Sequence, residues 1–202
     1  MNLVDRAKNI IMTPKTEWNV IAAEEPNAKA IFMGYALPLI LASALAGFIG
    51  NGFLWGSGYH GALAIKWGLY IGIQTAAMGI IGLWLTAYIV DYLAPNFGSE
   101  KSIGRAMQLV AYAMTPVWVG GLLMIFPPIG LIGSFLGLYG IYLIYLGLPK
   151  IMKTAEDKTI AYMVVTFIVM IIVFAIVMSI TKGILWDMMG LGILTGSGII
   201  GM

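Results

Sequence analysis

The stretch between Arg105 and Lys150 contains no charged side chain. A helix that crosses the hydrocarbon core of a bilayer needs about 20 apolar residues, so this stretch is long enough for two spans. Pro127 and Pro128 indicate a tight turn between them, because proline cannot continue a preceding helix. The chain is therefore expected to form a helical hairpin inside a membrane.

Three further apolar stretches reach the same length, and the whole chain is 60% hydrophobic and 10% charged. This composition is typical of a multispan membrane protein. We predict an all-α polytopic membrane protein, a five-transmembrane-helix bundle with an N-terminal amphipathic interfacial helix. The expected spans are residues 31–53, 65–92, 105–126, 128–148 and 159–181. Around them we expect a cytoplasmic interfacial segment at 1–30, a transmembrane domain at 31–182 and a glycine-rich external tail at 183–202.

The basic residues are distributed unevenly about these spans. Nine of the eleven lysines and arginines precede span one or lie in the loops after spans two and four, and the other side has only Lys66 and Lys182. The positive-inside rule then predicts a cytoplasmic N-terminus and an external C-terminus. The helical rise from Lys66 to Asp91 is about 37 Å, so these two side chains can reach opposite interfaces. Arg105 is expected at the cytoplasmic interface, where span three begins.

Residues 2–12 have the pattern of an amphipathic helix. The apolar face consists of Leu3, Val4, Ala7, Ile10 and Ile11, and the polar face of Asp5, Arg6, Lys8 and Asn9. Thr13 and Pro14 then predict the start of a second short helix, whose Trp18 is a residue type enriched at membrane interfaces. We predict that both helices anchor the chain to the cytoplasmic surface of the membrane. Docking to a protein partner is the alternative.

Glycines recur every three or four residues in two of the spans. Span two carries Gly68, Gly72, Gly79 and Gly82, and span four carries Gly130, Gly133, Gly137 and Gly140. Each set forms one stripe along a helix face, and small residues at this spacing let helix backbones approach closely in lipid. We predict helix packing at these glycines, with a groove for a ligand or lipid as the alternative. Span five has few small residues and is expected at the rim, facing lipid.

Prolines interrupt spans one and three. Pro38 and Pro116 lack the N–H that would bond to the preceding turn, so both helices are expected to kink. Thr115 can donate its hydroxyl to a carbonyl of that turn. We interpret these sites as packing kinks, and a hinge or a solute site at a broken helix is the alternative. The segment GYALP around Pro38 also resembles AYAMTP around Pro116, which indicates either two related hairpins or a chance recurrence.

The chain offers few groups for catalysis or metal binding. It has no cysteine and one histidine, which argues against a thiolate or histidine metal site. Ser57 and His60 share one loop but lack a nearby carboxylate to orient them. Asp91 is alone in its span and cannot form a pair of catalytic carboxylates. We therefore expect no enzyme activity, cofactor or metal ion. The net charge of only +2 also argues against a nucleic-acid partner.

Four segments carry a family resemblance. They are GRAMQLVAYAMTPVWVGGLL, GLYGIYLIYLGLPKIMKTAEDKTIAY, IIMTPKTEWNVIAAEEP and YLAPNFGSEKS. Together they resemble the Yip domain family of integral membrane proteins in its shorter prokaryotic form. The resemblance implies a five-helix domain with a cytoplasmic N-terminus in a prokaryotic inner or plasma membrane. Eukaryotic relatives are tied to Rab GTPases and vesicle traffic but carry a longer hydrophilic N-terminal region, a departure that argues against carrying GTPase binding over to this chain.

Two function classes fit these observations. We predict a non-enzymatic membrane scaffold or interaction protein of the Yip type, whose cytoplasmic face binds a partner or shapes the bilayer. The alternative is a small-solute channel or transporter that uses the kinked spans one and three. Transporters usually place ionisable groups at mid-membrane, and this chain is predicted to have none there, which favours the scaffold. The bilayer is the expected partner, and the sequence leaves a protein partner and a homo-oligomer open.

Overall fold

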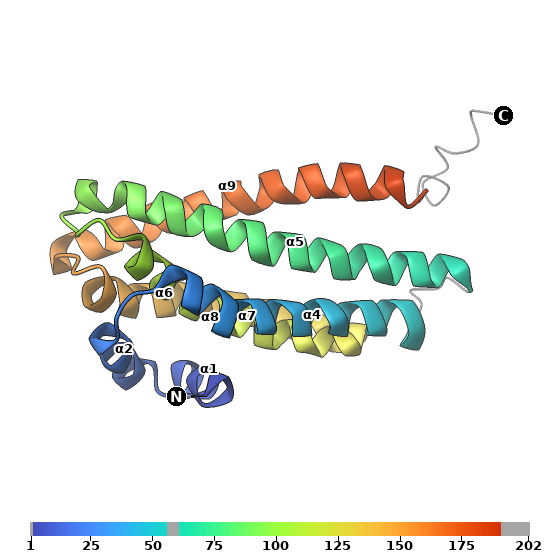
Figure 1. Cartoon of the computed structure of the whole chain (residues 1–202), viewed down its shortest axis with the longest axis horizontal. Helices are drawn as coiled ribbons and strands as arrows, with labels where there is room; N and C mark the ends of the chain where they lie inside the picture. Colours follow the sequence, from blue (N-terminus) through green and yellow to red (C-terminus); the bar gives the residue numbers. More distant parts are fainter. Residues whose placement is uncertain (1, 56–60, 191–202) are drawn as a thin grey trace.

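A computed structural model describes residues 2–55 and 61–190 of the chain. Within these residues the regular structure is helical, and five segments are long and apolar enough to cross a membrane. They are Ala28–Leu54, Ala62–Phe97, Ile103–Ile125, Pro127–Ile151 and Glu156–Met188. The predicted all-α polytopic fold with five spans is thus confirmed. Figure 1 shows the spans as one bundle with two short N-terminal helices, α1 and α2, packed at one end.

The helices divide the chain as follows. The N-terminal segment forms α1 (Leu3–Met12) and α2 (Pro14–Ala23). Span one comprises α3 (Ala28–Ile31), the π-helix η1 (Phe32–Ala36), α4 (Leu37–Ile49) and the π-helix η2 (Gly50–Leu54). Span two comprises α5 (Ala62–Leu93) and the short 3-10 helix η4 (Ala94–Phe97). Span three comprises α6 (Ile103–Ala113), α7 (Thr115–Gly121) and the 3-10 helix η5 (Leu122–Ile125), and spans four and five are α8 (Pro127–Ile151) and α9 (Glu156–Met188).

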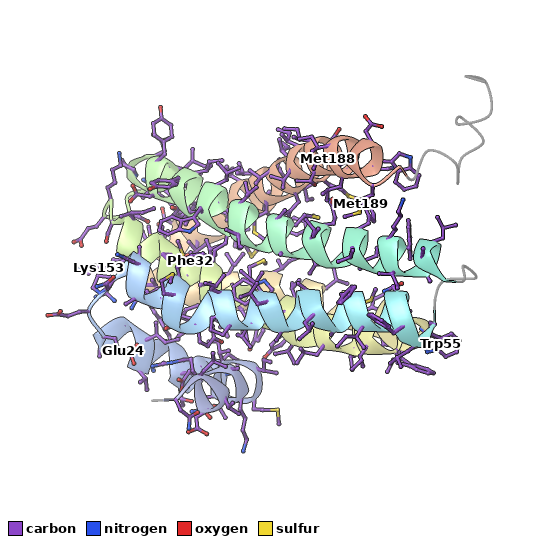
Figure 2. All side chains as sticks on the ribbon, turned by 45° about the vertical axis from the view of Figure 1, so that its right-hand side comes forward. Glu24, Phe32, Trp55, Lys153, Met188 and Met189 are labelled. Atoms are coloured by element: carbon purple, nitrogen blue, oxygen red, sulfur yellow. The ribbon has the colours of Figure 1, made fainter. Side chains whose placement is uncertain are left out.

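Helices α1 and α2 together form a unit that we call the hairpin, distinct from the pair of spans three and four. The end of the bundle that carries it is the hairpin end, and the opposite end is the far end. Figure 2 shows Glu24 and Lys153 at the hairpin end and Trp55 at the far end. Residues 183–188, expected in the C-terminal tail, belong to α9, because the apolar pattern continues to Trp186 and no proline interrupts it. The rest of that predicted tail, residues 191–202, lies outside the described residues.

Asparagine and serine side chains set where several helices begin. The Asn2 side chain accepts from the Asp5 N–H at 2.8 Å, that of Asn27 from the Ala30 N–H at 2.9 Å, and that of Ser102 from the Arg105 N–H at 3.4 Å. Each side-chain oxygen accepts from a donor that has no partner within the helix. Span two ends where Gly98 adopts a left-handed conformation with φ of 69°, which glycine takes without strain.

Aromatic side chains gather at two levels along α5, as is common where helices leave the hydrocarbon core. At the far end, Trp67 and Tyr70 stack with ring centroids 5.4 Å apart, and Trp186 of α9 packs edge-on against both. Toward the hairpin end, Tyr88 and Tyr92 are exposed. The helical rise from Trp67 to Tyr88 is about 30 Å, which equals the thickness of the hydrocarbon core. The separation of these two levels therefore matches that of the two interfaces of a bilayer.

Helix α5 lies between α4 and α9, while α8 packs on α6 and α7 (Figure 1). The spans differ in how much of each is covered by protein. In α9, 22% of the apolar stretch is buried, against 61% in span three. Bulky side chains of α9 such as Ile171 and Ile176 are exposed. Span five therefore lies at the rim of the bundle, as its composition predicted.

Span three breaks near Pro116. Helix α6 ends at Ala113 and α7 begins at Thr115, and the N–H of Val117 bonds to the carbonyl of Met114 at 3.0 Å in a tighter turn. Pro116 is buried inside the bundle. The break is consistent with the missing N–H of proline and the clash of its ring with the preceding turn.

Span one accommodates its proline differently. The helix continues past Pro38, because the π-helical turn in η1 lets the N–H of Leu37 bond to the carbonyl of Phe32. Pro38 is exposed, and nothing lies within 4 Å of the position that a Cβ of Gly34 would occupy. Pro38 thus faces outward from the bundle. Of the two prolines, only Pro116 packs inside the protein.

Cysteine labelling in intact cells tests the predicted orientation. The chain has no cysteine, and Lys66 and Glu100 are exposed near opposite ends of the bundle. We expect a Lys66→Cys variant to react with a membrane-impermeant maleimide in intact cells and a Glu100→Cys variant to react only after permeabilisation. The opposite labelling pattern would place the N-terminus outside.

Candidate functional site

A buried cluster of charges joins the two N-terminal helices. Arg6 of α1 is 5% exposed and donates to Glu17 Oε1 at 2.7 Å and to Glu24 at the end of α2. The ring centroid of Tyr112 lies 5.4 Å from the guanidinium carbon, within the range of a cation–π interaction. The sequence pattern placed Arg6 on the exposed face of α1. The structure buries it instead, because two carboxylates and an aromatic face replace the water that it loses.

Trp18 fixes this hairpin to the bundle. Its side chain is fully buried, and its ring packs edge-on against Tyr112 with centroids 6.4 Å apart. A Cβ at Gly147 of α8 would lie 2.9 Å from Trp18 Cζ2, so the missing side chain provides the slot for the indole. Trp18, expected at the membrane surface, is therefore inside the protein, because this slot removes nearly all of its surface from solvent and lipid.

Side chains of the bundle also bind the hairpin backbone. Tyr139 Oη donates to the Ile11 carbonyl at 2.9 Å, Lys150 Nζ to the Lys15 carbonyl at 2.6 Å and Gln108 Nε2 to the Ile21 carbonyl at 3.4 Å. The Ile11 and Ile21 carbonyls lie in the last turns of α1 and α2, where backbone donors run out. The Ile21 carbonyl also accepts from the Glu24 N–H at 3.1 Å. The bundle therefore adds hydrogen bonds at both helix ends of the hairpin and holds it in one position.

A pair of hydroxyls joins span one to the break in span three. Tyr35 Oη and Thr115 Oγ1 lie 2.6 Å apart, and both side chains are buried. Thr115 Oγ1 is 3.5 Å from the Ala111 carbonyl, which is at the limit of a hydrogen bond, so Tyr35 is its main partner. The rings of Tyr35 and Tyr112 meet edge-on at 4.7 Å, so the similar segments GYALP and AYAMTP touch in space.

The other three residues predicted at the interfaces lie apart from this cluster. Lys66 is exposed near the far end of α5, and Asp91 is half-buried near its hairpin end, with one carboxylate oxygen covered and without a hydrogen-bond partner. Arg105 is half-buried at the start of α6 and donates to Gln108 Oε1 at 3.0 Å. Lys66 and Asp91 are thus separated along the axis of α5, as their spacing requires.

Four of the eight predicted packing glycines face backbone. In α5, a Cβ at Gly68 would lie 2.5 Å from Gly52 Cα, and one at Gly72 would lie 3.1 Å from the Ala44 oxygen. In α8, a Cβ at Gly140 would lie 2.9 Å from the Ala113 oxygen. Gly133 faces Gly120, whose own Cβ would lie 2.6 Å from the Gly133 oxygen. At Gly68, Gly133 and Gly140 the backbones leave no room for a side chain, and at Gly72 an added methyl group would need a small shift of its neighbour. These positions join α4 to α5, and span three to α8.

The remaining four glycines face side chains. Gly79 meets Ile40, Gly82 meets Phe174 and Gly130 meets Met124 at distances too short for an added Cβ. At Gly137 the nearest atom is a Val117 methyl at 3.7 Å, an ordinary contact. Seven of the stripe positions are therefore tight, and Gly137 has room for a methyl group.

An apolar cavity of about 350 Å³ lies beside these contacts, lined by α4, α5, span three and α9. Ser43 and Thr75 are its polar lining residues, and the Ser43 hydroxyl already donates to the Leu39 carbonyl at 3.0 Å. Such walls do not suit an ion or a polar solute, so the cavity gives the transporter alternative no support.

Among the described residues, no group of three histidine, aspartate or glutamate side chains is placed to hold a metal ion. Ser57 and His60, which the sequence assigned to a loop without catalytic geometry, lie outside the described residues. Sequence reasoning missed the pairing of Arg6 with α2. The signal was present, because Glu17 and Glu24 are spaced to share one face of a helix.

These features define a class of protein, a five-span membrane protein with a helical hairpin docked on one end of its bundle. The chain belongs to the Yip1 domain family, whose model matches residues 8–177. It is similar to the inner membrane protein YohC of Escherichia coli strain K12 and of Escherichia coli O6:H1, each 23% identical over 179 residues that cover 86% of this chain and 91% of the relative. No solved structure matches the chain significantly. The family resemblance drawn from the sequence is thus confirmed.

Alanine substitutions in α8 test the backbone contact between α7 and α8. A methyl group at Gly133 would meet the Gly120 backbone, which cannot move unless the helices separate, so we expect Gly133→Ala to cost about 1–3 kcal/mol. Gly137→Ala is the matched control one turn away, where the methyl fits, and its effect is expected to be small. Thermal unfolding in mild detergent measures both. Equal shifts would contradict the packing role of Gly133.

Removing the buried charge of Arg6 tests how the hairpin is held. In an Arg6→Met variant Glu17 is left buried without its partner, which we expect to cost about 3–5 kcal/mol. The exposed pair of Lys153 and Glu100, 3.0 Å apart, provides the control, because Glu100→Gln is expected to cost only about 0–1 kcal/mol. Thermal unfolding and hydrogen exchange in α1 and α2 report the effect. A loss no larger than that of Glu100→Gln would contradict this account.

Proposed function

We propose that this chain is a non-enzymatic scaffold of a prokaryotic inner membrane, which shapes the cytoplasmic leaflet through its N-terminal hairpin. The proposal depends on one observation. Helices α1 and α2 are docked at one end of the bundle only, where the ion pairs of Arg6 with the buried Glu17 and the half-exposed Glu24 join them into one unit. We assign this end to the cytoplasm from the excess of lysine and arginine on that side.

The outer surface of the hairpin supports contact with lipid. Val4 is 70% exposed and Met12 is 71% exposed, although both are apolar. Close by on α8, the exposed Tyr142 and Tyr145 are of the type that marks the interface level. An amphipathic helix at this level buries its apolar side chains at the boundary between headgroups and acyl chains. The hairpin therefore adds protein volume to one leaflet and widens that leaflet alone.

Rigid docking turns this added volume into a wedge. A loosely tethered helix could leave the membrane when the bilayer resists bending, whereas Trp18 fills the slot at Gly147 and three side chains of the bundle bind the hairpin backbone. The molecule is then broader at the hairpin end than at the far end. Such a shape favours curvature in which the leaflet at the hairpin end is the outer, expanded one.

Reconstitution into vesicles tests the wedge. Wild-type protein is inserted in one orientation into vesicles of phosphatidylethanolamine and phosphatidylglycerol, with the orientation checked by labelling a Glu100→Cys variant. With the hairpin outward we expect vesicle diameter to fall as the protein content rises, because each molecule expands the outer leaflet. A double variant, Val4→Ser with Met12→Ser, should lose most of this effect. Vesicle diameters are measured by electron cryomicroscopy.

The far end supplies the matched control. Ile184 and Met188 of α9 are also exposed and apolar, so a double variant with serine at both positions removes similar surface without touching the hairpin. We expect it to reduce vesicle diameter as the wild type does. Diameters that do not change with wild-type protein, or that fall equally with the hairpin variant, would contradict bilayer shaping. A cytoplasmic protein crosslinked specifically to α1 would then favour a partner-binding scaffold.

A further inference from the structure

We propose that the apolar cavity between α5, span three and α9 is a binding site for one acyl chain of a bilayer phospholipid. The cavity has a volume of about 350 Å³, which lies within the range of about 300–1,000 Å³ typical of small-molecule sites in proteins. Neither the family match nor the relatives assign a ligand to this place.

The depth of the cavity determines what can reach it. Thr75, one of its lining residues, lies on α5 between the aromatic levels of Tyr70 and Tyr88 that mark the two interfaces. Val117 also lines the cavity and is 39% exposed, so the cavity opens to the surface of the bundle at mid-span. At that depth the medium outside is hydrocarbon rather than water. The molecules that meet this opening are therefore lipid tails.

Helix α9 covers one side of the site incompletely. The one lining residue from α9 is Phe174, whose ring packs on Gly82. Beyond it toward the far end, Ile176 and Ile180 are exposed.

The walls suit a flexible apolar chain. Three of the lining residues are Met78, Met114 and Met124, and Trp118 and Phe174 add aromatic surface. Methionine side chains are unbranched and polarizable, so they adapt to ligands of irregular shape. Ser43, the buried hydroxyl of the wall, is engaged by backbone carbonyls of its own helix and of Trp118. The walls thus offer dispersion contacts and no charged group, which is what a lipid tail requires.

Fluorescence quenching tests whether a chain occupies the site. The full-length protein is placed in nanodiscs of phosphatidylcholine with bromine at mid-chain, and the signal of Trp118 is obtained by difference from a Trp118→Phe variant. We expect Trp118 to lose most of its fluorescence although its side chain is buried, because the bound chain brings bromine into contact with it. Trp18, fully buried in the docked hairpin, should keep its signal. An unquenched Trp118 would overturn the proposal.

A cavity-filling substitution separates a bound chain from lipid that surrounds the bundle. We expect Thr75→Phe to place a ring in the cavity and to restore the Trp118 signal. Ile73→Phe is the matched control, because Ile73 is exposed on the same helix and does not line the cavity, and quenching should persist in it. Should Thr75→Phe fail to fold, Val117→Phe fills the cavity from α7. Equal quenching in the filled variant and in Ile73→Phe would overturn the proposal.

Thermal unfolding of delipidated protein in detergent identifies the source of the chain. We expect a long-chain phosphatidylglycerol near saturation to raise the unfolding midpoint by about 5–10 °C, and a short-chain phosphatidylglycerol with the same headgroup to leave it unchanged. The shift should disappear in Thr75→Phe and persist in Ile73→Phe. If oleate alone gives the full shift and the phospholipid gives none, the site takes a free fatty acid and the assignment to a phospholipid is overturned.

Discussion

Contact between peptide backbones at glycine is the interaction on which this bundle depends. Lipid tails are as apolar as leucine, so burial of apolar side chains does not by itself draw helices together in a membrane. Gly52 with Gly68 and Gly120 with Gly133 let two pairs of helices approach until their backbones touch, which increases the number of close dispersion contacts. These two contacts join span one to span two and span three to span four. Helix α9 lies at the rim because it has almost no small residues.

The hairpin end is stabilised by a different physical effect. There the charges of Arg6 and Glu17 are taken out of water together, and Glu24 pairs with Arg6 from the rim. A buried ion pair adds little net stability compared with an apolar core but is costly to disrupt. Its main consequence is positional, because each member can be satisfied only when α1 and α2 are in register. Trp18 and the side chains that cap the hairpin carbonyls then set where this unit sits on α6 and α8.

The spans could be predicted from the sequence because a stretch of about 20 apolar residues has few other uses, and the glycine stripes indicated their packing faces. The environments of Arg6 and Trp18 could not be predicted in this way. Residue type reports an average environment, whereas the burial of Trp18 depends on the missing side chain of Gly147 in another helix. The pairing of Tyr35 with Thr115 likewise requires two spans to be in contact. At Pro38 a π-helical turn carries the helix past the proline, and the bond from the Leu37 N–H to the Phe32 carbonyl depends on backbone geometry that the sequence pattern does not show.

The docking of the hairpin sets an order of events during synthesis. Its bonds to Gln108, Tyr139 and Lys150 join residues 87, 128 and 135 positions apart. The first needs span three, and the other two need most of span four, to have been made by the ribosome. At about 5–20 residues per second, the nascent N-terminus waits on the order of ten seconds without its binding site. The ion pairs of Arg6 span only 11 and 18 positions and can form first. They keep the unit neutralised and compact at the membrane surface until Gly147 emerges to receive Trp18.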